Sequence, residues 1–372
     1  MHTPICDRLG CEVPIFAFSH CRDVVAEVSR AGGFGVLGGS TFSPEQFETE
    51  LQWIDEHTAG QPYGVDVLIP TVYDKQAEAT PEQLEGLIPT EHRAFLDRIL
   101  TEHGVPELPD VERTRLRHEL AAGRGAMTPD GARTLIDIAL KHPQVKLVVS
   151  ALGTPPPDVI RQLREHNVVI GALCGKARHA THHLAAGVDV IIAQGTEAGG
   201  HTGDIATMVL VPEVVATVGD RASVLAAGGI THGSQIAASL AMGAQGVWCG
   251  TVWLGTRESE LDDFERQVLF QTGSDGTVRR KARTGKTVRM IRSELSEAWE
   301  RPGAPDYLPT PLQGVLYNEA HARVVRAHRK ELYSFPVGQS VGAVTGNTAV
   351  ADVMYRLQLE YGEAMERLAE LM

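Results

Sequence analysis

Residues 188–203 read VDVIIAQGTEAGGHTG, an apolar run that leads directly into a glycine-rich loop. The run is short and rich in β-branched residues, as expected for a buried parallel strand. The loop sets one acid, Glu197, and one histidine, His201, among its glycines. A loop with so few side chains either lets the backbone approach a ligand closely or makes turns that only glycine tolerates.

Seven similar runs occur elsewhere, so eight strands are predicted in all. Most intervals between them carry helix signals, such as the Ser-Pro that opens residues 43–57 and the prolines that open residues 155–166. Strands alternating with helices in this way predict a (β/α)8 TIM barrel, whose chemistry lies on the loops after the strands. The strands are predicted at residues 14–18, 34–38, 63–69, 145–151, 167–173, 188–194, 222–228 and 245–250.

Two stretches do not follow this alternation. Residues 71–129 are polar, charged and helical in part, which predicts an insertion after strand three of a barrel formed by residues 1–255. Residues 256–372 contain several helical runs and few strand-like ones. A mainly helical region that packs on the barrel is therefore expected at the carboxyl-terminal end.

Composition limits the partners and the compartment. The net charge of −13 disfavours nucleic acid and anionic membrane surfaces as binding partners, because like charges repel. The basic residues 278–292 depart from this balance; a solvated helix face is expected there, with a local anion site as the alternative. The five cysteines are scattered without a CxxC spacing, and no apolar run approaches the roughly 20 residues that span a bilayer. A cytoplasmic protein is expected, and a homo-oligomer is compatible with the sequence.

Metal binding is not indicated. His179, His182 and His183 have a helical spacing that metal sites use, but no carboxylate or cysteine accompanies them in register. They are expected to lie on an exposed helix face.

Three glycine-rich segments, GTEAGGHTG, AAGGITHG and GVWCGTVW, come at the predicted ends of strands six, seven and eight. In barrel enzymes the last two of these loops often bind phosphate, because glycine permits close approach and the following helix N-terminus favours an anion. Gly228, Gly229, Gly250 and Thr251 are the candidates. The chain has no Walker A sequence and no GxGxxG that opens a helix after strand one, which disfavours nucleoside triphosphate and Rossmann sites.

In combination these segments resemble the nitronate monooxygenases, formerly 2-nitropropane dioxygenases, which are FMN-dependent TIM-barrel enzymes. The matching pieces keep the family's order and cover most of the barrel. They include VSRAGGFGVLGG at 28–39, YGVDVLIP at 63–70, the segments at 187–203 and 224–254, and TGKTVRM at 284–290. The resemblance implies FMN redox chemistry on a small organic substrate.

The resemblance also implies roles for individual residues. His201 would be the catalytic base, since an imidazole that titrates near neutrality can remove a weakly acidic proton beside a nitro group; the alternative is that it only holds its own loop. Glu197 is expected to be structural and to accept backbone N–H groups within its turn. The residues that would hold or border FMN are Phe18, Ser19, His20, Asp66, Gln194, Gly199, Gly200, Ala227, Gly228, Gly229, Gly250, Thr251 and Gln339.

The chain departs from the family pattern at the barrel mouth. Asp66 stands where the family usually has Asn, and it could act as an acid or base if burial raises its pKa. The segment AFSHCRD brings His20 and Cys21 to the end of strand one, where His20 could supplement or replace His201. The lysine that some members carry after strand five is absent, with Leu173 near its place. The loops expected to bind phosphate keep the family pattern, whereas the barrel mouth does not. The resemblance therefore supports the family's cofactor for this chain more strongly than the family's substrate.

The leading functional prediction is the FMN-dependent oxidation of alkyl nitronates by dioxygen to a carbonyl compound and nitrite. An NAD(P)H-dependent reductase of quinones or of enoyl or acyl thioesters is the alternative on the same fold, with the basic residues 278–292 suited to a nucleotide or coenzyme A phosphate. A non-catalytic flavin-binding protein is a second alternative. A phosphosugar isomerase shares the phosphate loops but does not explain the sequence EAGGH.

Overall fold

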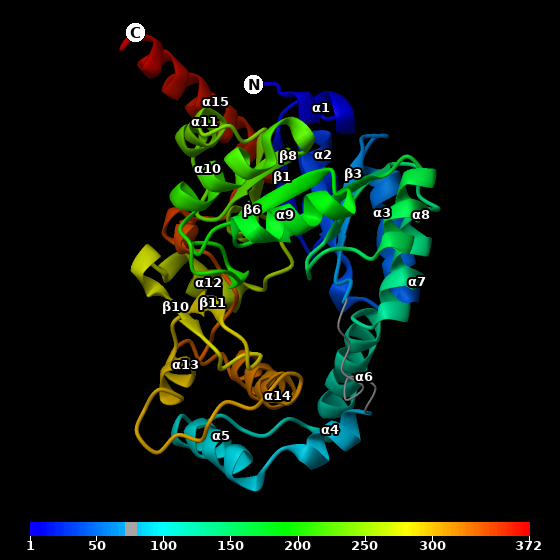
Figure 1. The fold of residues 1–372 in the computed structure, drawn as a ribbon. Coiled ribbons are helices and arrows are strands. Elements are labelled where there is room, and N and C mark those ends of the chain that lie inside the picture. The colour runs from blue at the N-terminus through cyan, green and yellow to red at the C-terminus, as the bar shows by residue number, and fades with distance from the viewer. Residues whose placement is uncertain (71–79) are drawn as a thin grey trace.

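The protein is described by a computed structural model that covers residues 1–70 and 80–372. Eight parallel strands close into a barrel in the order β1-β2-β3-β4-β5-β6-β8-β9, with helices packed around them (Figure 1). The predicted TIM barrel is therefore confirmed. Its strands are β1 (Ile15–Ser19), β2 (Phe34–Gly38), β3 (Tyr63–Val67), β4 (Val145–Ser150), β5 (Val169–Cys174), β6 (Val190–Gln194), β8 (Ser223–Ala227) and β9 (Gly246–Cys249).

The helices around the barrel begin at the predicted signals. Ser43 caps the start of α3 by accepting a hydrogen bond from the Gln46 N–H, and the Gln46 side chain reciprocates. The last helix of the chain, α15 (Val350–Ala369), packs against α2 and α11 and so covers the remaining flank of the barrel. The other helices are α2 (Arg22–Arg30), α3 (Pro44–His57), α7 (Pro129–Ala139), α8 (Pro157–Glu165), α9 (Ala177–Ala186), α10 (Thr207–Val218) and α11 (Gly233–Ala241).

Side chains inside the barrel form a core of their own, as the alternation along each strand requires. The short helix α1 (Pro4–Leu9) adds Ile5 and Leu9 to this core, and the Thr3 hydroxyl donates to the carbonyl of Gln245, just before β9. The amino-terminal end of the barrel is thus closed by α1. Loops that could carry chemistry therefore lie at the opposite, carboxyl-terminal end of the strands.

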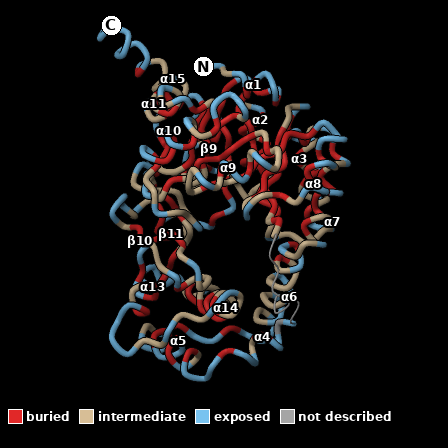
Figure 2. The backbone as a smooth tube through the Cα atoms, in the orientation of Figure 1, coloured by how far each residue is buried: buried red, intermediate tan, exposed pale blue. Residues whose placement is uncertain are grey.

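A second apolar core joins two distant parts of the chain. Residues between 88 and 105 pack together with residues between 261 and 344, and Figure 2 shows this buried region around α14, apart from the barrel core. Residues 71–79, which begin the expected insertion, lie outside the described residues. The helices of this part are α4 (Pro81–Leu87), α5 (Thr90–Glu102), α6 (Asp110–Ala126), α12 (Asp263–Gln271), α13 (Glu294–Ala298) and α14 (Leu312–Arg326).

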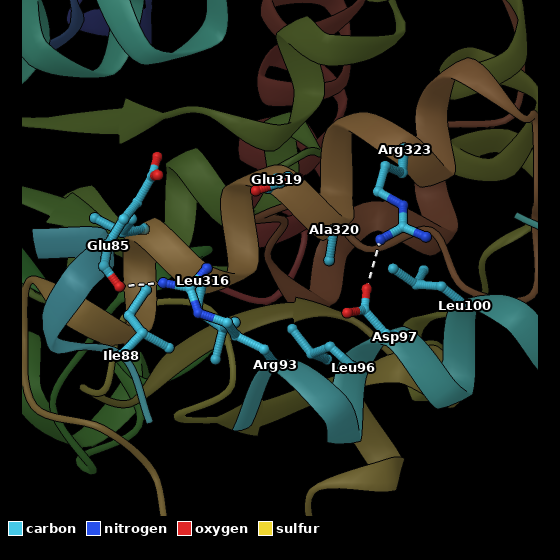
Figure 3. Close-up of a pocket in the computed structure, with 11 residues that line it drawn as sticks. Glu85, Ile88, Arg93, Leu96, Asp97, Leu100, Leu316, Glu319, Ala320 and Arg323 are labelled. Atoms are coloured by element: carbon cyan, nitrogen blue, oxygen red, sulfur yellow. Dashed lines mark hydrogen bonds and ion pairs between the residues drawn. The ribbon is translucent and has the colours of Figure 1, made fainter. Parts of the chain in front are cut away.

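A small cavity of about 90 Å³ lies between α4, α5 and α14 (Figure 3). Arg323 of α14 is 7% exposed and donates to the Asp97 carboxylate at 2.7 Å and to the Pro106 carbonyl at 3.0 Å. Arg117 of α6 makes a bidentate pair with Glu85 of α4, at 2.7 and 2.6 Å. These ion pairs join the inserted helices to one another and to α14, so the cavity belongs to the packing of this second core.

The basic residues 278–292 form a β-hairpin, so the expected helix face is wrong. Strands β10 (Thr277–Arg280) and β11 (Val288–Ile291) pair with each other, and β11 also pairs with β7 (Gly200–His201). β10 ends in two adjacent arginines, and β11 is a buried strand with one arginine, Arg289, in an otherwise apolar run. The charge of the segment concealed these two short strands in the sequence. The single-turn helices are η1 (Gly39–Thr41), η3 (Gly219–Arg221), η4 (Thr251–Gly255), η5 (Ser274–Gly276) and η6 (Gln339–Ala343).

The histidines of α9 are not all on an exposed face. His183 is buried, its Nδ1 lies 2.8 Å from the Thr154 hydroxyl, and its Nε2 lies 3.1 Å from the Leu173 carbonyl. His183 is therefore a hydrogen-bonded core residue, which corrects the prediction. Within residues 1–70 and 80–372, no helix combines the length and the apolar character needed to cross a membrane.

Candidate active site

Strand register brings the predicted residues of β2, β3, β6 and β8 to the same end of the barrel. Gly38 pairs with Asp66 between β2 and β3, and Gln194 pairs with Ala227 between β6 and β8. Because parallel strands end at the same edge, these residues surround the barrel mouth. The predicted glycine loops follow directly from the same strand ends.

The end of β1 presents a phenyl ring and an imidazole. The Phe18 ring stacks on Trp248 at 6.1 Å between centroids and meets the edge of His20 at 5.2 Å. The His20 Nδ1 lies 2.9 Å from the Gly38 carbonyl, which can only accept, so Nδ1 carries a proton. The Ser19 hydroxyl accepts the N–H of Cys21 and is used within the turn.

Asp66 is an acid in an apolar setting. Its side chain is 5% exposed, and among the described residues no hydrogen-bond donor reaches its carboxyl group. Burial raises the pKa of Asp66 well above its ordinary value. The neutral carboxylic acid, with one O–H donor and one C=O acceptor, resembles the side-chain amide of the Asn that the family usually has at this position.

The loops after β8 and β9 have the backbone expected of a phosphate site. Gly228 and Gly229 have φ of +113° and +73°, which a side chain would strain. A Cβ on Gly250 would meet no described atom nearer than the Phe18 carbonyl oxygen, at 4.0 Å. In the described part of the chain, the N–H groups of Gly229, Gly250 and Thr251 have no backbone acceptor. They can therefore donate to an anion in the open space beside Gly250.

Glu197 caps a helix. Its carboxylate accepts the Thr207 N–H at 2.9 Å and the Thr207 hydroxyl at 2.8 Å, at the first residue of α10. Ala206 occupies the N-cap position and has no side-chain oxygen to do this. Glu197 thus accepts a backbone N–H group, as expected, but the group belongs to the first residue of α10 and not to the turn that carries Glu197.

Residues 337–339 lie directly on the loop that carries Glu197. The Gln339 N–H donates to the Glu197 carbonyl at 2.8 Å, and the Gly338 N–H donates to the Thr251 hydroxyl at 2.8 Å. A Cβ on Gly199 would lie 2.7 Å from the carbonyl carbon of Val337, so glycine is required for this close approach. The predicted late Gly-Gln segment thus connects the loops after β6 and β9, while the Gln339 side chain is exposed.

His201 lies on β7, at the edge of the three-stranded sheet. Its Nε2 is 2.9 Å from the hydroxyl oxygen of Thr284, in the loop between β10 and β11. Partial loss of water around the ring, together with the cationic Lys286 and Arg283, lowers the pKa of His201. The lowered pKa favours the neutral imidazole, which is the form that can accept a proton.

The sequence prediction missed the residues that support His201 and its loop. Thr284 and Lys286 belong to the segment TGKTVRM, which was recognised only as part of a resemblance. The guanidinium of Arg289 is buried and donates to the Thr196 carbonyl at 2.7 Å and to the Thr277 hydroxyl at 3.0 Å. The signal for Arg289 was a charged residue in the apolar run VRMI.

Comparisons with known proteins agree with the resemblance. The family model described as nitronate monooxygenase matches residues 18–360. The chain is 46% identical to a putative monooxygenase, Rv1533, of Mycobacterium tuberculosis, with 100% of this chain and 99% of the relative covered. It is 28% identical to a probable nitronate monooxygenase of Staphylococcus aureus, with 94% and 95% covered.

Solved structures share the fold. The structure of nitroalkane oxidase from Streptomyces ansochromogenes has a TM-score of 0.78 at 26% identity, covering 98% of this chain and 99% of that one. FabK from Thermotoga maritima has a TM-score of 0.72 at 23% identity, with both chains fully covered. The second likeness concerns the fold alone.

Proposed function

Because the chain belongs to the nitronate monooxygenase family of flavin-dependent oxidoreductases, we propose that it oxidises alkyl nitronates with dioxygen to a carbonyl compound and nitrite, with FMN as cofactor. The observation that carries the proposal is the imidazole of His201 on β7, in the segment that follows β6, with its Nε2 held 2.9 Å from the Thr284 hydroxyl. A base of this kind lets the enzyme accept neutral nitroalkanes as well as nitronates.

The residues at the mouth fit FMN. The unused N–H groups of Gly229, Gly250 and Thr251 would hold its phosphate, in the space that a side chain at Gly250 would fill, and Gly228 would permit the close approach. The ring would lie among the larger residues of the mouth, which are Phe18, His20, Asp66, Gln194 and the backbone of Gly199 and Gly200. Bound FMN supplies the redox step, taking electrons from the substrate and passing them to dioxygen.

The protein's own residues would act on the proton and on the charge. His201 takes the proton from the carbon beside the nitro group, and the electron pair of the broken C–H bond moves into the nitro group to give the nitronate anion. Lys286 and Arg283, whose charges act on His201, also favour this anion. A substrate that is supplied as the nitronate anion does not need this proton transfer. Turnover of the neutral nitroalkane therefore depends on His201, whereas turnover of the nitronate does not.

An NAD(P)H-dependent reductase is the second candidate. The observation that favours it is the basic hairpin of β10 and β11, which lies beside His201. Arg279 and Arg280 are committed to ion pairs with Asp204 and Glu297, whereas Lys286 is exposed and available to a phosphate.

Anaerobic mixing distinguishes the two functions. The FMN-loaded protein is mixed separately with propyl-2-nitronate, NADH and NADPH, and the flavin absorbance is followed by stopped flow. We expect rapid bleaching by the nitronate. Rapid bleaching by a pyridine nucleotide together with indifference to nitronate would establish the reductase instead, and a protein that binds no FMN would exclude both.

His201→Ala tests the role of the base. The variant is expected to bind FMN normally and to lose about 10²- to 10⁴-fold in kcat/KM with neutral nitroethane, because a general base contributes that much. Its activity with ethyl nitronate should change far less, since that substrate needs no base. Full activity of the variant with nitroethane would assign the base to His20 or Asp66.

A further inference from the structure

The hydroxyl of Thr284 has three polar neighbours. Its oxygen lies 2.9 Å from the His201 Nε2, 3.2 Å from the Lys286 carbonyl oxygen and 3.3 Å from the Lys286 N–H. A threonine hydroxyl has one proton to donate and two lone pairs with which to accept. The assignment of these three contacts therefore decides which nitrogen of His201 carries a proton.

The Lys286 carbonyl can only accept, and the Lys286 N–H can only donate. All three contacts can be hydrogen bonds at once only if the Thr284 proton points to the Lys286 carbonyl and one of the two lone pairs receives the Lys286 N–H. The remaining lone pair faces His201 Nε2, which must then be the donor. With Nε2 protonated, the neutral imidazole has its free lone pair on Nδ1.

We propose that Thr284 is a positioning residue, which fixes His201 in the Nε2–H tautomer and makes Nδ1 the atom that takes the substrate proton. The tautomer assignment rests on the hydrogen-bond geometry alone, whereas the proton transfer rests on the proposed function. In that step the substrate C–H bond breaks, an Nδ1–H bond forms, and the electron pair remains with the nitronate. The resulting imidazolium keeps its Nε2–H bond to Thr284, so the ring does not turn during the reaction.

Both partners of this hydrogen bond are held by backbone structure. His201 pairs with Val288 across β7 and β11, directly after the loop that carries Thr284. The Thr310 hydroxyl donates to the Thr284 carbonyl at 2.5 Å, and Gly285 packs on the backbone of Leu308. Thr284 is thus anchored independently of His201, as a residue that orients another must be.

Long-range ¹⁵N–¹H NMR of histidine-labelled protein reads the tautomer directly, with the His201 signals among 15 histidines identified by their loss in His201→Ala. We expect the Nε2–H tautomer in the native protein and in Thr284→Ser. In Thr284→Val a mixture or the opposite tautomer is expected. Thr287→Val is the matched control, because it removes a hydroxyl from the same loop but leaves the Thr284 hydroxyl and its anchor at Thr310 in place.

Kinetics with paired substrates test the consequence. Thr284→Val should lower kcat/KM for nitroethane by about 10- to 100-fold, a part of what the base itself contributes, and should leave ethyl nitronate turnover within about 2-fold. Thr284→Ser should restore the nitroethane rate, and Thr287→Val should leave it near the native value. Equal losses with both substrates would indicate a general structural role for Thr284 and overturn the proposal.

The two measurements separate this proposal from the proposed function. An Nδ1–H tautomer of His201 in the native protein refutes the proposal whatever the substrate proves to be. A native Nε2–H tautomer that is lost in Thr284→Val and kept in Thr287→Val supports the positioning role even if nitronates do not reduce the flavin. Nitronate reduction with an unchanged tautomer in Thr284→Val supports the function and refutes the positioning role.

Discussion

Replacing Glu197 distinguishes a structural acid from a catalytic one. The Glu197 carboxylate makes hydrogen bonds of 2.9 and 2.8 Å to Thr207 and serves as the missing cap of α10. A helix cap is worth about 1 kcal/mol, and hydrogen bonds to a charged group about 1.5 to 3 kcal/mol each. Because these bonds share one donor residue and do not add fully, Glu197→Ala should cost about 2 to 4 kcal/mol.

Glu197→Gln should cost less, about 1 kcal/mol, because its amide oxygen still accepts from Thr207 while the negative charge at the helix N-terminus is lost. For a chain of this length we expect roughly 2 °C per kcal/mol. The melting temperature should therefore fall by about 4 to 8 °C in Glu197→Ala and about 2 °C in Glu197→Gln. Circular dichroism of the FMN-loaded proteins measures both values.

The matched control is Glu213→Ala, which removes the same charge from an exposed position on the same helix. It should change the stability by no more than about 0.5 kcal/mol. Nitronate turnover by Glu197→Gln, measured well below its melting temperature, should stay within a few-fold of the native rate. A Glu197→Gln variant with native stability and more than about 100-fold lower turnover would refute the structural role and place Glu197 in the chemistry.

Three further predictions follow from the described contacts. Burial raises the pKa of Asp66, so the native protein should lose stability as the pH rises from the unfolded-state pKa near 4 to the folded-state pKa, by at most about 1.4 kcal/mol per pH unit. Asp66→Asn should lack this loss. Melting temperatures of the two proteins that change in parallel from pH 4 to 8 would contradict the prediction. Gly250→Ala should leave the melting temperature of the cofactor-free protein unchanged, because the described atom nearest to the new methyl group is the Phe18 carbonyl oxygen, at an unstrained 4.0 Å. The variant should weaken FMN binding by about 10-fold or more, and riboflavin, which lacks the phosphate, is the control ligand in the titration. Arg323→Met leaves the Val105 and Pro106 carbonyls without their donor and should lower the free energy of unfolding by about 2 to 4 kcal/mol. The loss should appear as faster hydrogen exchange in α5. Arg326→Met, at an exposed ion pair with Glu112, is the control and should cost under about 1 kcal/mol.

The eight barrel strands could be predicted because each is a short apolar run bounded by glycines or polar residues. Buried strands of a parallel barrel have this pattern along the chain itself, without reference to any partner. The three-stranded sheet could not be found in this way. Its edge strand β7 has two residues, and the hairpin of residues 277–291 is dominated by its charge.

Some residues of the candidate site could likewise be predicted from the sequence, and others could not. Asp66, Gln194 and the glycine-rich loops after β8 and β9 could be placed at the barrel mouth from the strand ends, because barrel geometry fixes where strand ends meet. Thr284 was missed because its contact with His201 joins residues 83 positions apart in the chain. Likewise, the sequence shows a glycine at 199 but not that the backbone of Val337 passes against it.

The second core has a consequence for how the protein is made. Asp97 and Arg323, which meet across it, are 226 residues apart, so a ribosome adding 5 to 20 residues per second needs about 10 to 45 s to supply the partner. During that time the apolar faces of α5 are exposed on a nascent chain whose early barrel strands have already emerged. The inserted helices are therefore the segment of this protein that we expect to depend most on chaperones during synthesis.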